Sequence, residues 1–205
     1  MYSLAGAAQL SFESADPIFV PTTSRCVQLG DHGALYTPEG LAEIYREHLL
    51  PLATIVTPNS FEAELLTGLP CTTLEEGVAA CKALQAAGAR DVIITSIDEP
   101  QTIALVGRPG GGAAERGFCI RVRKHKQHFG GTGDLLAGLL VAYTAAYPDD
   151  LGRAAARAVG SVQGVIARTI EVRRKPGERD SGLQLVASRD LILDPPEALC
   201  SLSPT

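Results

Sequence analysis

The chain has 205 residues, 45% of them hydrophobic, which suffices for one domain with a substantial core. Its formal net charge of −5 and pI of about 5.4 exclude the broad basic surface typical of nucleic-acid-binding proteins. No apolar run approaches the ~20 residues that span a bilayer, and the first residues lack the charged start and apolar core of a signal peptide. We therefore expect a cytoplasmic protein with neither a membrane nor a nucleic-acid partner.

The cysteines are odd in number and scattered without CxxC spacing, which favours reduced thiols over a disulfide framework or a zinc site. We expect most of them to be small buried hydrophobic residues. They are Cys26, Cys71, Cys81, Cys119 and Cys200.

Residues 1–25 mix small, polar and proline positions without a sustained period, so we assign them to an irregular segment ahead of one domain at 26–205. The first predicted element of that domain is an amphipathic helix, in which apolar residues recur at three- and four-residue intervals from Leu41 to Leu49. Thr37 is a suitable N-cap for this helix, and Pro51 is a suitable stop.

A β, helix, β pattern follows, which predicts parallel strands in a buried sheet. It consists of an apolar strand at Ala53 to Thr57, a helix at 74–87 ended by Gly88, and a second strand at Asp91 to Ser96. Two alternating segments, "TIALVG" and "GFCIRVR", are joined by a glycine- and proline-containing loop and predict an antiparallel hairpin at the edge of the sheet. Helices are expected at 134–147 and 151–172, and a short strand at 183–186.

The stretch "GGTGD" stands directly before an apolar helix. The first N–H groups of such a helix are unpaired and carry partial positive charge, so they suit a phosphate, and Gly131 and Gly133 let the backbone approach it closely. A carboxylate at Asp134 could then accept a proton from a hydroxyl that attacks a phosphoryl group, which predicts a kinase. The alternative is a tight turn followed by a favourable helix charge. Neither a P-loop nor a GxGxxG pattern occurs.

A second group of oxygen ligands, in "TPNSFEAELLTG", follows the strand that ends at Thr57. Thr57 and Glu62 could hold a hydrated magnesium ion, which takes one or two carboxylates together with waters and substrate phosphates. The alternative is purely structural, with Asn59 or Ser60 as the helix cap and Glu62 as a first-turn acid.

These two stretches, together with "ITS" at 94–96, resemble in sequence and order the nucleotide and catalytic segments of the pyridoxal kinase family, within the ribokinase-like superfamily. The resemblance extends over 26–196, through "LGDHGALYTPEGLAEIYREHLLPLA" and "LQLVASRDLILDPP". It implies a three-layer α/β/α fold with a mainly parallel sheet and an antiparallel edge hairpin.

The same resemblance implies ATP and Mg²⁺ as cofactors, with a monovalent cation such as K⁺ compatible, and pyridoxal as the substrate. Asp134 would be the base for the 5′-hydroxymethyl group, and Gly131, Thr132 and Gly133 would form the anion hole. Thr57 and Glu62 would arrange the metal ion and its waters. The residues implied at the nucleotide phosphates are Asp31, Tyr36, Asn59, Thr95, Ser96 and Thr132. Lys124, His125 and Lys126 would lie near the adenosine, or else form a solvated basic strand end.

The chain also departs from the family pattern. Cys26 and Val27 stand where the family has an aspartate-proline pair, and 1–25 do not resemble the family's N-terminal portion, so we expect an N-terminally truncated fold. That portion provides most of the pyridoxal pocket and much of the dimer contact, so a homodimer is expected only if the fold is complete. The predicted function is ATP-dependent phosphorylation of pyridoxal and related B6 vitamers in vitamin B6 salvage. The alternatives are a hydroxymethylpyrimidine or sugar kinase and a catalytically silent nucleotide-binding or dimerising module.

Overall fold

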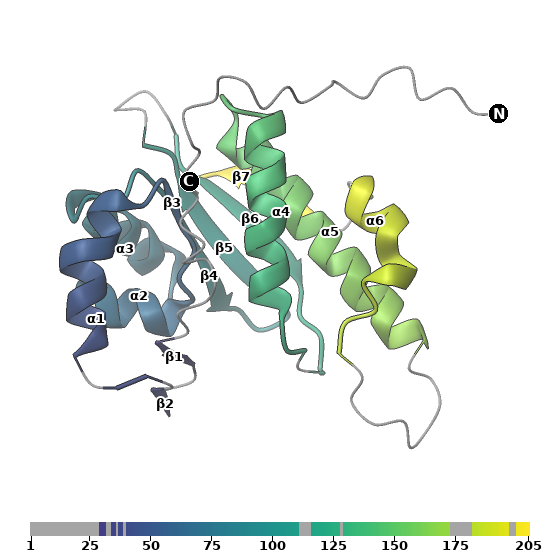
Figure 1. Cartoon of the computed structure of the whole chain (residues 1–205), viewed down its shortest axis with the longest axis horizontal. Helices are drawn as coiled ribbons and strands as arrows, with labels where there is room; N and C mark the ends of the chain where they lie inside the picture. Colours follow the sequence, from purple (N-terminus) through teal and green to yellow (C-terminus); the bar gives the residue numbers. More distant parts are fainter. Residues whose placement is uncertain are drawn as a thin grey trace.

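A computed structural model describes residues 29–31, 34–35, 37–38, 40–110, 116–127, 129–172, 182–196 and 200–205. It shows a five-stranded sheet in the order β3-β4-β5-β6-β7, with helices on both faces (Figure 1). The strands are β1 Gly30–Asp31, β2 Ala34–Leu35, β3 Ile55–Val56, β4 Asp91–Asp98, β5 Thr102–Arg108, β6 Phe118–Arg123 and β7 Cys200–Pro204. The helices are α1 Leu41–Ile44, α2 Ser60–Thr67, α3 Leu74–Ala86, α4 Thr132–Ala146, α5 Leu151–Val172 and α6 Arg189–Leu193.

Alternating side chains of the strands build a separate core on each face of the sheet. In β4, Val92 and Ile94 pack with the core beneath α2 and α3, whereas Ile93 packs with the core beneath α4 and α5. β5 repeats this alternation, with Val106 on the first face and Leu105 on the second. Both faces of these strands are therefore buried, and the three-layer α/β/α architecture that was predicted is confirmed.

The described sheet is mixed rather than mainly parallel. β3 pairs with β4 in parallel, and the other three pairings, β4-β5, β5-β6 and β6-β7, are antiparallel. The predicted hairpin is β5-β6, but it does not lie at the edge, because β7 pairs with β6 through the register Ile120↔Leu202. The sequence "CSLSP" of β7 gives little strand signal, since it is short and ends in proline.

The strand directions bring three connections to the same end of the sheet. β3 and β4 run in parallel, and β6 runs in the direction of β4 because each of them is antiparallel to β5. β3, β4 and β6 therefore finish at one end, which we call the carboxyl edge. The connection after β6 leads into α4, so α4 begins at this edge and packs along α5 (Figure 1).

Two local predictions were wrong. The first helix does not begin at a Thr37 cap: its N-cap is Gly40 at φ 88°, and the Thr37 hydroxyl donates instead to the Leu29 carbonyl at 3.4 Å. This helix continues through a π-helical turn, Tyr45–Leu49, into the 3-10 turn Leu50–Leu52, which takes in Pro51.

No strand forms at 183–186, where the chain enters the 3-10 turn Val186–Ser188 and then α6. The backbone N–H of Gln184 donates to the Thr169 hydroxyl of α5 at 3.0 Å, so a helix side chain takes the bond that a neighbouring strand would need. The alternating apolar residues of "LQLV" thus belong to a segment that packs on α5.

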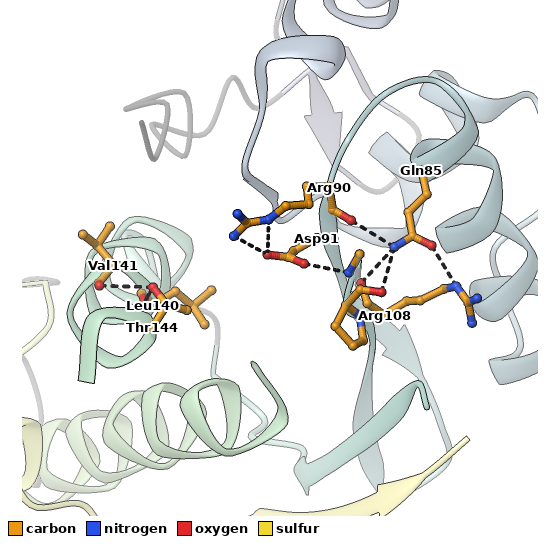
Figure 2. A network of polar contacts seen from close by, with 9 residues as sticks. Gln85, Arg90, Asp91, Arg108, Leu140, Val141 and Thr144 are labelled. Atoms are coloured by element: carbon orange, nitrogen blue, oxygen red, sulfur yellow. Dashed lines mark hydrogen bonds and ion pairs between the residues drawn. The ribbon is translucent and has the colours of Figure 1, made fainter. Parts of the chain in front are cut away.

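A polar network secures the end of the sheet opposite the carboxyl edge (Figure 2). The Gln85 amide nitrogen donates to the carbonyls of Arg90 at 3.0 Å, Arg108 at 3.3 Å and Pro109 at 3.2 Å. The buried Asp91 carboxylate accepts from Gly110 N–H at 2.8 Å and from the Arg90 guanidinium. These bonds fix the start of β4 relative to the end of β5.

The thiols of Cys71, Cys81 and Cys119 are free and buried, which confirms the prediction for these three residues. Burial raises the pKa of Cys71 to about 11 and that of Cys81 to about 12. Cys26 and the side chain of Cys200 lie outside the described residues. None of the described helices combines the length and apolar character needed to cross a membrane.

Candidate active site

The turn after β3 is a capping box that orders the start of α2. Asn59 is the N-cap, and its side-chain oxygen accepts the Glu62 N–H at 2.8 Å while Glu62 Oε2 accepts the Asn59 N–H at 2.9 Å. Glu62 Oε1 also accepts the N–H of Leu29 at 3.0 Å, so this buried carboxylate ties the segment before β1 to α2. The structural alternative for Asn59 and Glu62 is therefore present in the fold.

Tyr45 lies close enough to this capping box to respond to its charge. Its pKa is raised first by burial and then by the negative charge of Glu62. Thr57, at the end of β3, is half-buried, and it stands two residues before the N-cap. The sequence-predicted pair Thr57 and Glu62 thus lies in one turn at the carboxyl edge.

The end of β4 is joined directly to that turn. Thr95 N–H donates to the Pro58 carbonyl at 2.8 Å, and Thr95 forms an isolated parallel bridge with Asn59. Ser96 is exposed and has a φ of 64°, which is uncommon for a residue other than glycine. Its carbonyl accepts from the Ser60 hydroxyl at 3.3 Å. A break in the β4-β5 register between Ile94 and Ile97 surrounds this position.

The glycine stretch forms the start of α4, as predicted, and it directly follows the buried Phe129. Gly131 is the N-cap at φ 84°, a left-handed conformation that favours glycine, and no side chain of the described residues caps the helix. The Thr132 hydroxyl donates backwards to the Phe129 carbonyl at 3.4 Å. Gly133 and Asp134 are exposed in the first turn. The first N–H groups of α4 and the Asp134 carboxylate are thus presented together at the carboxyl edge.

Of the predicted nucleotide residues, Asp31 is described only in its backbone and Tyr36 is not described. Asp31 lies in β1 and pairs with Ala34 of β2, but its side chain is outside the described residues, as is all of Tyr36.

Among the described residues, the fold brings the Thr57 to Glu62 turn into contact with Thr95 and Ser96. It places Gly131 to Asp134 on the same edge of the sheet.

A basic cavity of about 790 Å³ lies at the end of β6. Its lining includes Arg121, Arg123, Lys124, His125 and Lys126 of the β6 end, together with Ser201 of β7. The basic run in the sequence indicated Lys124, His125 and Lys126, whereas Arg121 of β6 was not indicated. The nearby Glu99 pairs with Arg121 at 3.2 Å, and the Thr102 hydroxyl and this guanidinium hold the pKa of Glu99 below its usual range.

The donors in the turn after β3 fit a hydrated magnesium ion rather than a metal held by protein ligands alone. Among the described residues, no three His, Cys, Asp or Glu side chains cluster as a metal site. Mg²⁺ needs no such cluster, because it keeps several waters and takes one or two carboxylates with substrate phosphates. Glu62 offers a buried carboxylate whose orientation is fixed by two backbone N–H groups.

Comparison with known proteins identifies the family. The model of the phosphomethylpyrimidine kinase family matches residues 25–180. The chain belongs to this family. Among its curated relatives, the pyridoxal kinase of Arabidopsis thaliana is 39% identical over 173 residues, which cover 82% of this chain and 56% of that protein. The pyridoxal kinase of Homo sapiens is 34% identical, over 82% of this chain and 60% of that protein.

Solved structures agree with the sequence relationship. Pyridoxal kinase from Leishmania donovani, in complex with ADP and pyridoxamine, superposes with a TM-score of 0.76 at 28% identity, covering 86% of this chain and 59% of that one. Pyridoxal kinase from Trypanosoma brucei superposes with a TM-score of 0.71 at 30% identity, covering 82% and 57%. The predicted resemblance to pyridoxal kinases and the ribokinase-like fold are confirmed. The chain spans a little over half the length of these relatives.

Proposed function

We propose that this chain transfers the γ-phosphoryl group of ATP to the 5′-hydroxymethyl oxygen of pyridoxal or a related B6 vitamer, giving pyridoxal 5′-phosphate and ADP in vitamin B6 salvage. The observation that carries this proposal is the exposed Asp134 in the first turn of an α4 whose N-terminus has no side-chain cap within the described residues. A carboxylate suited to a general base and N–H groups suited to phosphate thus lie in one turn, and the chain belongs to a kinase family.

In the proposed reaction, the N–H groups of Gly131, Thr132 and Gly133 bind the oxygens of the transferring phosphoryl group. The substrate hydroxyl gives its proton to the Asp134 carboxylate as its oxygen forms a bond to the γ-phosphorus, and the bond from that phosphorus to the ADP oxygen breaks. The exposed position of Asp134 leaves it accessible to a substrate hydroxyl.

Mg²⁺, when bound with ATP, neutralises the charge that develops on the phosphate oxygens. We assign its water shell to Thr57 and Glu62, with the Glu62 carboxylate fixed by the capping box. Asn59, Thr95, Ser96, Asp31 and Tyr36 are assigned to the ATP phosphates. The basic cavity at the end of β6 is assigned to the nucleotide, because its cations suit polyphosphate. A K⁺ ion and a cytoplasmic location also belong to this proposal, and so does a homodimer if the fold is complete.

Two other functions are each favoured by one observation. The matching family model is described as phosphomethylpyrimidine kinase, which favours a hydroxymethylpyrimidine as the acceptor. Cys26 and Val27 stand where the family has an aspartate-proline pair, which favours a nucleotide-binding module without transfer activity.

The test is product formation by the purified 205-residue chain with magnesium ATP and either pyridoxal or hydroxymethylpyrimidine, combined with calorimetry of ATP binding. Pyridoxal 5′-phosphate as the preferred product is the expected result. Preferential phosphorylation of hydroxymethylpyrimidine would replace the acceptor that we propose. ATP binding without any product would identify the silent module, and neither binding nor product would contradict the kinase assignment.

A further inference from the structure

The connection between β6 and α4, residues 124–131, carries the glycine stretch and is anchored near both of its ends. At its start, the Lys124 N–H donates to the Gln101 carbonyl at 3.2 Å, and the Lys124 ammonium pairs with Asp98. Near its end, the Phe129 side chain is 7% exposed and belongs to the core beneath α4 and α5. Between these anchors the connection must span the carboxyl edge.

A side chain of α5 contacts the start of this connection, directly after Lys124. His125 Nε2 lies 3.0 Å from Gln163 Oε1, and the two residues are separated by 38 positions in the sequence. An amide oxygen only accepts hydrogen bonds, so in this arrangement the imidazole donates from Nε2. Gln163 is half-buried between the buried Val162 and Gly164, where a polar group is costly unless it is bonded. The hydrogen bond therefore gives both side chains a fixed orientation.

His125 also lines the basic cavity, among Arg121, Arg123, Lys124 and Lys126. We propose that Gln163 is a positioning residue for the kinase reaction: by its hydrogen bond to His125 it holds the start of the 124–131 connection, and with it one wall of the nucleotide cavity. Gln163 acts through His125 and touches no substrate atom itself. This inference rests on the proposed nucleotide-binding function.

The experiment measures binding of magnesium ADP by calorimetry to the unaltered chain, Gln163→Leu, His125→Ala and the double variant. Loss of one hydrogen bond that preorganises the site predicts binding weaker by about 3- to 10-fold in Gln163→Leu. Because the two residues act as one unit, the double variant should bind no more weakly than His125→Ala alone. Glu171→Leu, an exposed polar-to-leucine change on the same helix, is the control and should leave binding unchanged.

Thermal unfolding of each variant separates a positioning role from a structural one, since a structural role would lower the melting temperature without weakening ADP binding in the folded protein. If Gln163→Leu does not fold, Gln163→Asn replaces it, because the shorter amide cannot reach the imidazole, and the same weakening is expected. Unchanged ADP binding in folded Gln163→Leu or Gln163→Asn would overturn this inference, and so would additive effects in the double variant. Either result would leave the proposed function standing. If the unaltered chain does not bind ADP, the proposed function fails and the inference fails with it.

Discussion

Replacing Glu62 with glutamine should affect both the stability of the fold and its use of magnesium, because the structure gives this carboxylate a capping role beside the proposed metal position. Glu62 Oε1 accepts the Leu29 N–H at 3.0 Å and Oε2 accepts the Asn59 N–H at 2.9 Å. Glutamine offers one acceptor oxygen, and its amide nitrogen would face the other N–H donor.

The size of the effect follows from these contacts. Leaving one buried N–H unpaired costs about 1–3 kcal/mol, and Glu62 is only 8% exposed, so solvent does not replace the lost bond. Taking about 2 kcal/mol and the response of a domain of this size, the melting temperature should fall by roughly 4–8 °C. If Glu62 also orders the metal waters, the magnesium concentration for half-maximal rate should rise several-fold at temperatures where the variant is folded.

The second capping box of the chain provides a matched control. In α3, Glu76 Oε2 accepts the Thr73 N–H at 3.0 Å and the Thr72 N–H at 2.8 Å, in the same local geometry but on an exposed surface. Glu76→Gln should therefore lower the melting temperature less than Glu62→Gln and leave the magnesium titration unchanged. Thermal unfolding and initial rates against magnesium concentration are measured on both variants. An unshifted magnesium titration in a folded Glu62→Gln variant would reduce Glu62 to a helix cap and refute its assignment to the metal.

Three further predictions follow from the geometry. Gly131→Ala should lower the free energy of unfolding in urea by about 1–2 kcal/mol, because a φ of 84° is strained for alanine. Gly138→Ala has open space around the added Cβ and should instead stabilise α4 by about 0.5–1 kcal/mol. Equal effects of the two substitutions would contradict this expectation. Because the pKa of Glu99 is lowered in the folded protein, Glu99 stabilises the fold at pH values above its ordinary pKa of 4.5, and this stability is lost as the pH falls through the folded pKa. Glu99→Gln should therefore make the melting temperature less sensitive to acid. An unchanged dependence of the melting temperature on pH would exclude this role. With a pKa of about 12, Cys81 should resist alkylation at about pH 8 until the chain unfolds, and mass spectrometry that finds it labelled as fast as in denatured protein would contradict its burial.

The sequence predicted elements where local patterns decide the structure. The helices predicted at 151–172 and 74–87 are present as α5 and α3, because their patterns are local in the sequence. β7 was missed and the 183–186 segment was mispredicted, because their conformation depends on partners distant in the chain, namely β6 and Thr169 of α5. The sheet was expected to be mainly parallel on the basis of the family resemblance, whereas the described strands after β4 pair in antiparallel fashion.

The residues of the candidate site also fall into those that local sequence signals indicated and those that depend on distant packing. The residue types of "TPNSFEAELLTG" and "GGTGD" indicated Glu62 and Asp134, because caps, glycines and carboxylates at a strand or helix end are local signals. The pairing of His125 with Gln163 has no local signal, since it requires the packing of α5 beside the end of β6. Likewise, Arg121 lies outside the basic run of the sequence, and only the fold shows that it lines the basic cavity.

The most direct test of the central claim is transfer of phosphate from magnesium ATP to pyridoxal by the full chain and by its Asp134→Ala variant, followed as pyridoxal 5′-phosphate formed. Asp134 lies in the exposed first turn of α4, so its removal should leave the fold and most ATP affinity intact. The proposed general base predicts turnover about 10²- to 10⁴-fold lower in the variant. Equal turnover in the two proteins would remove Asp134 from the mechanism, and absence of product from the unaltered chain would contradict the proposed activity itself.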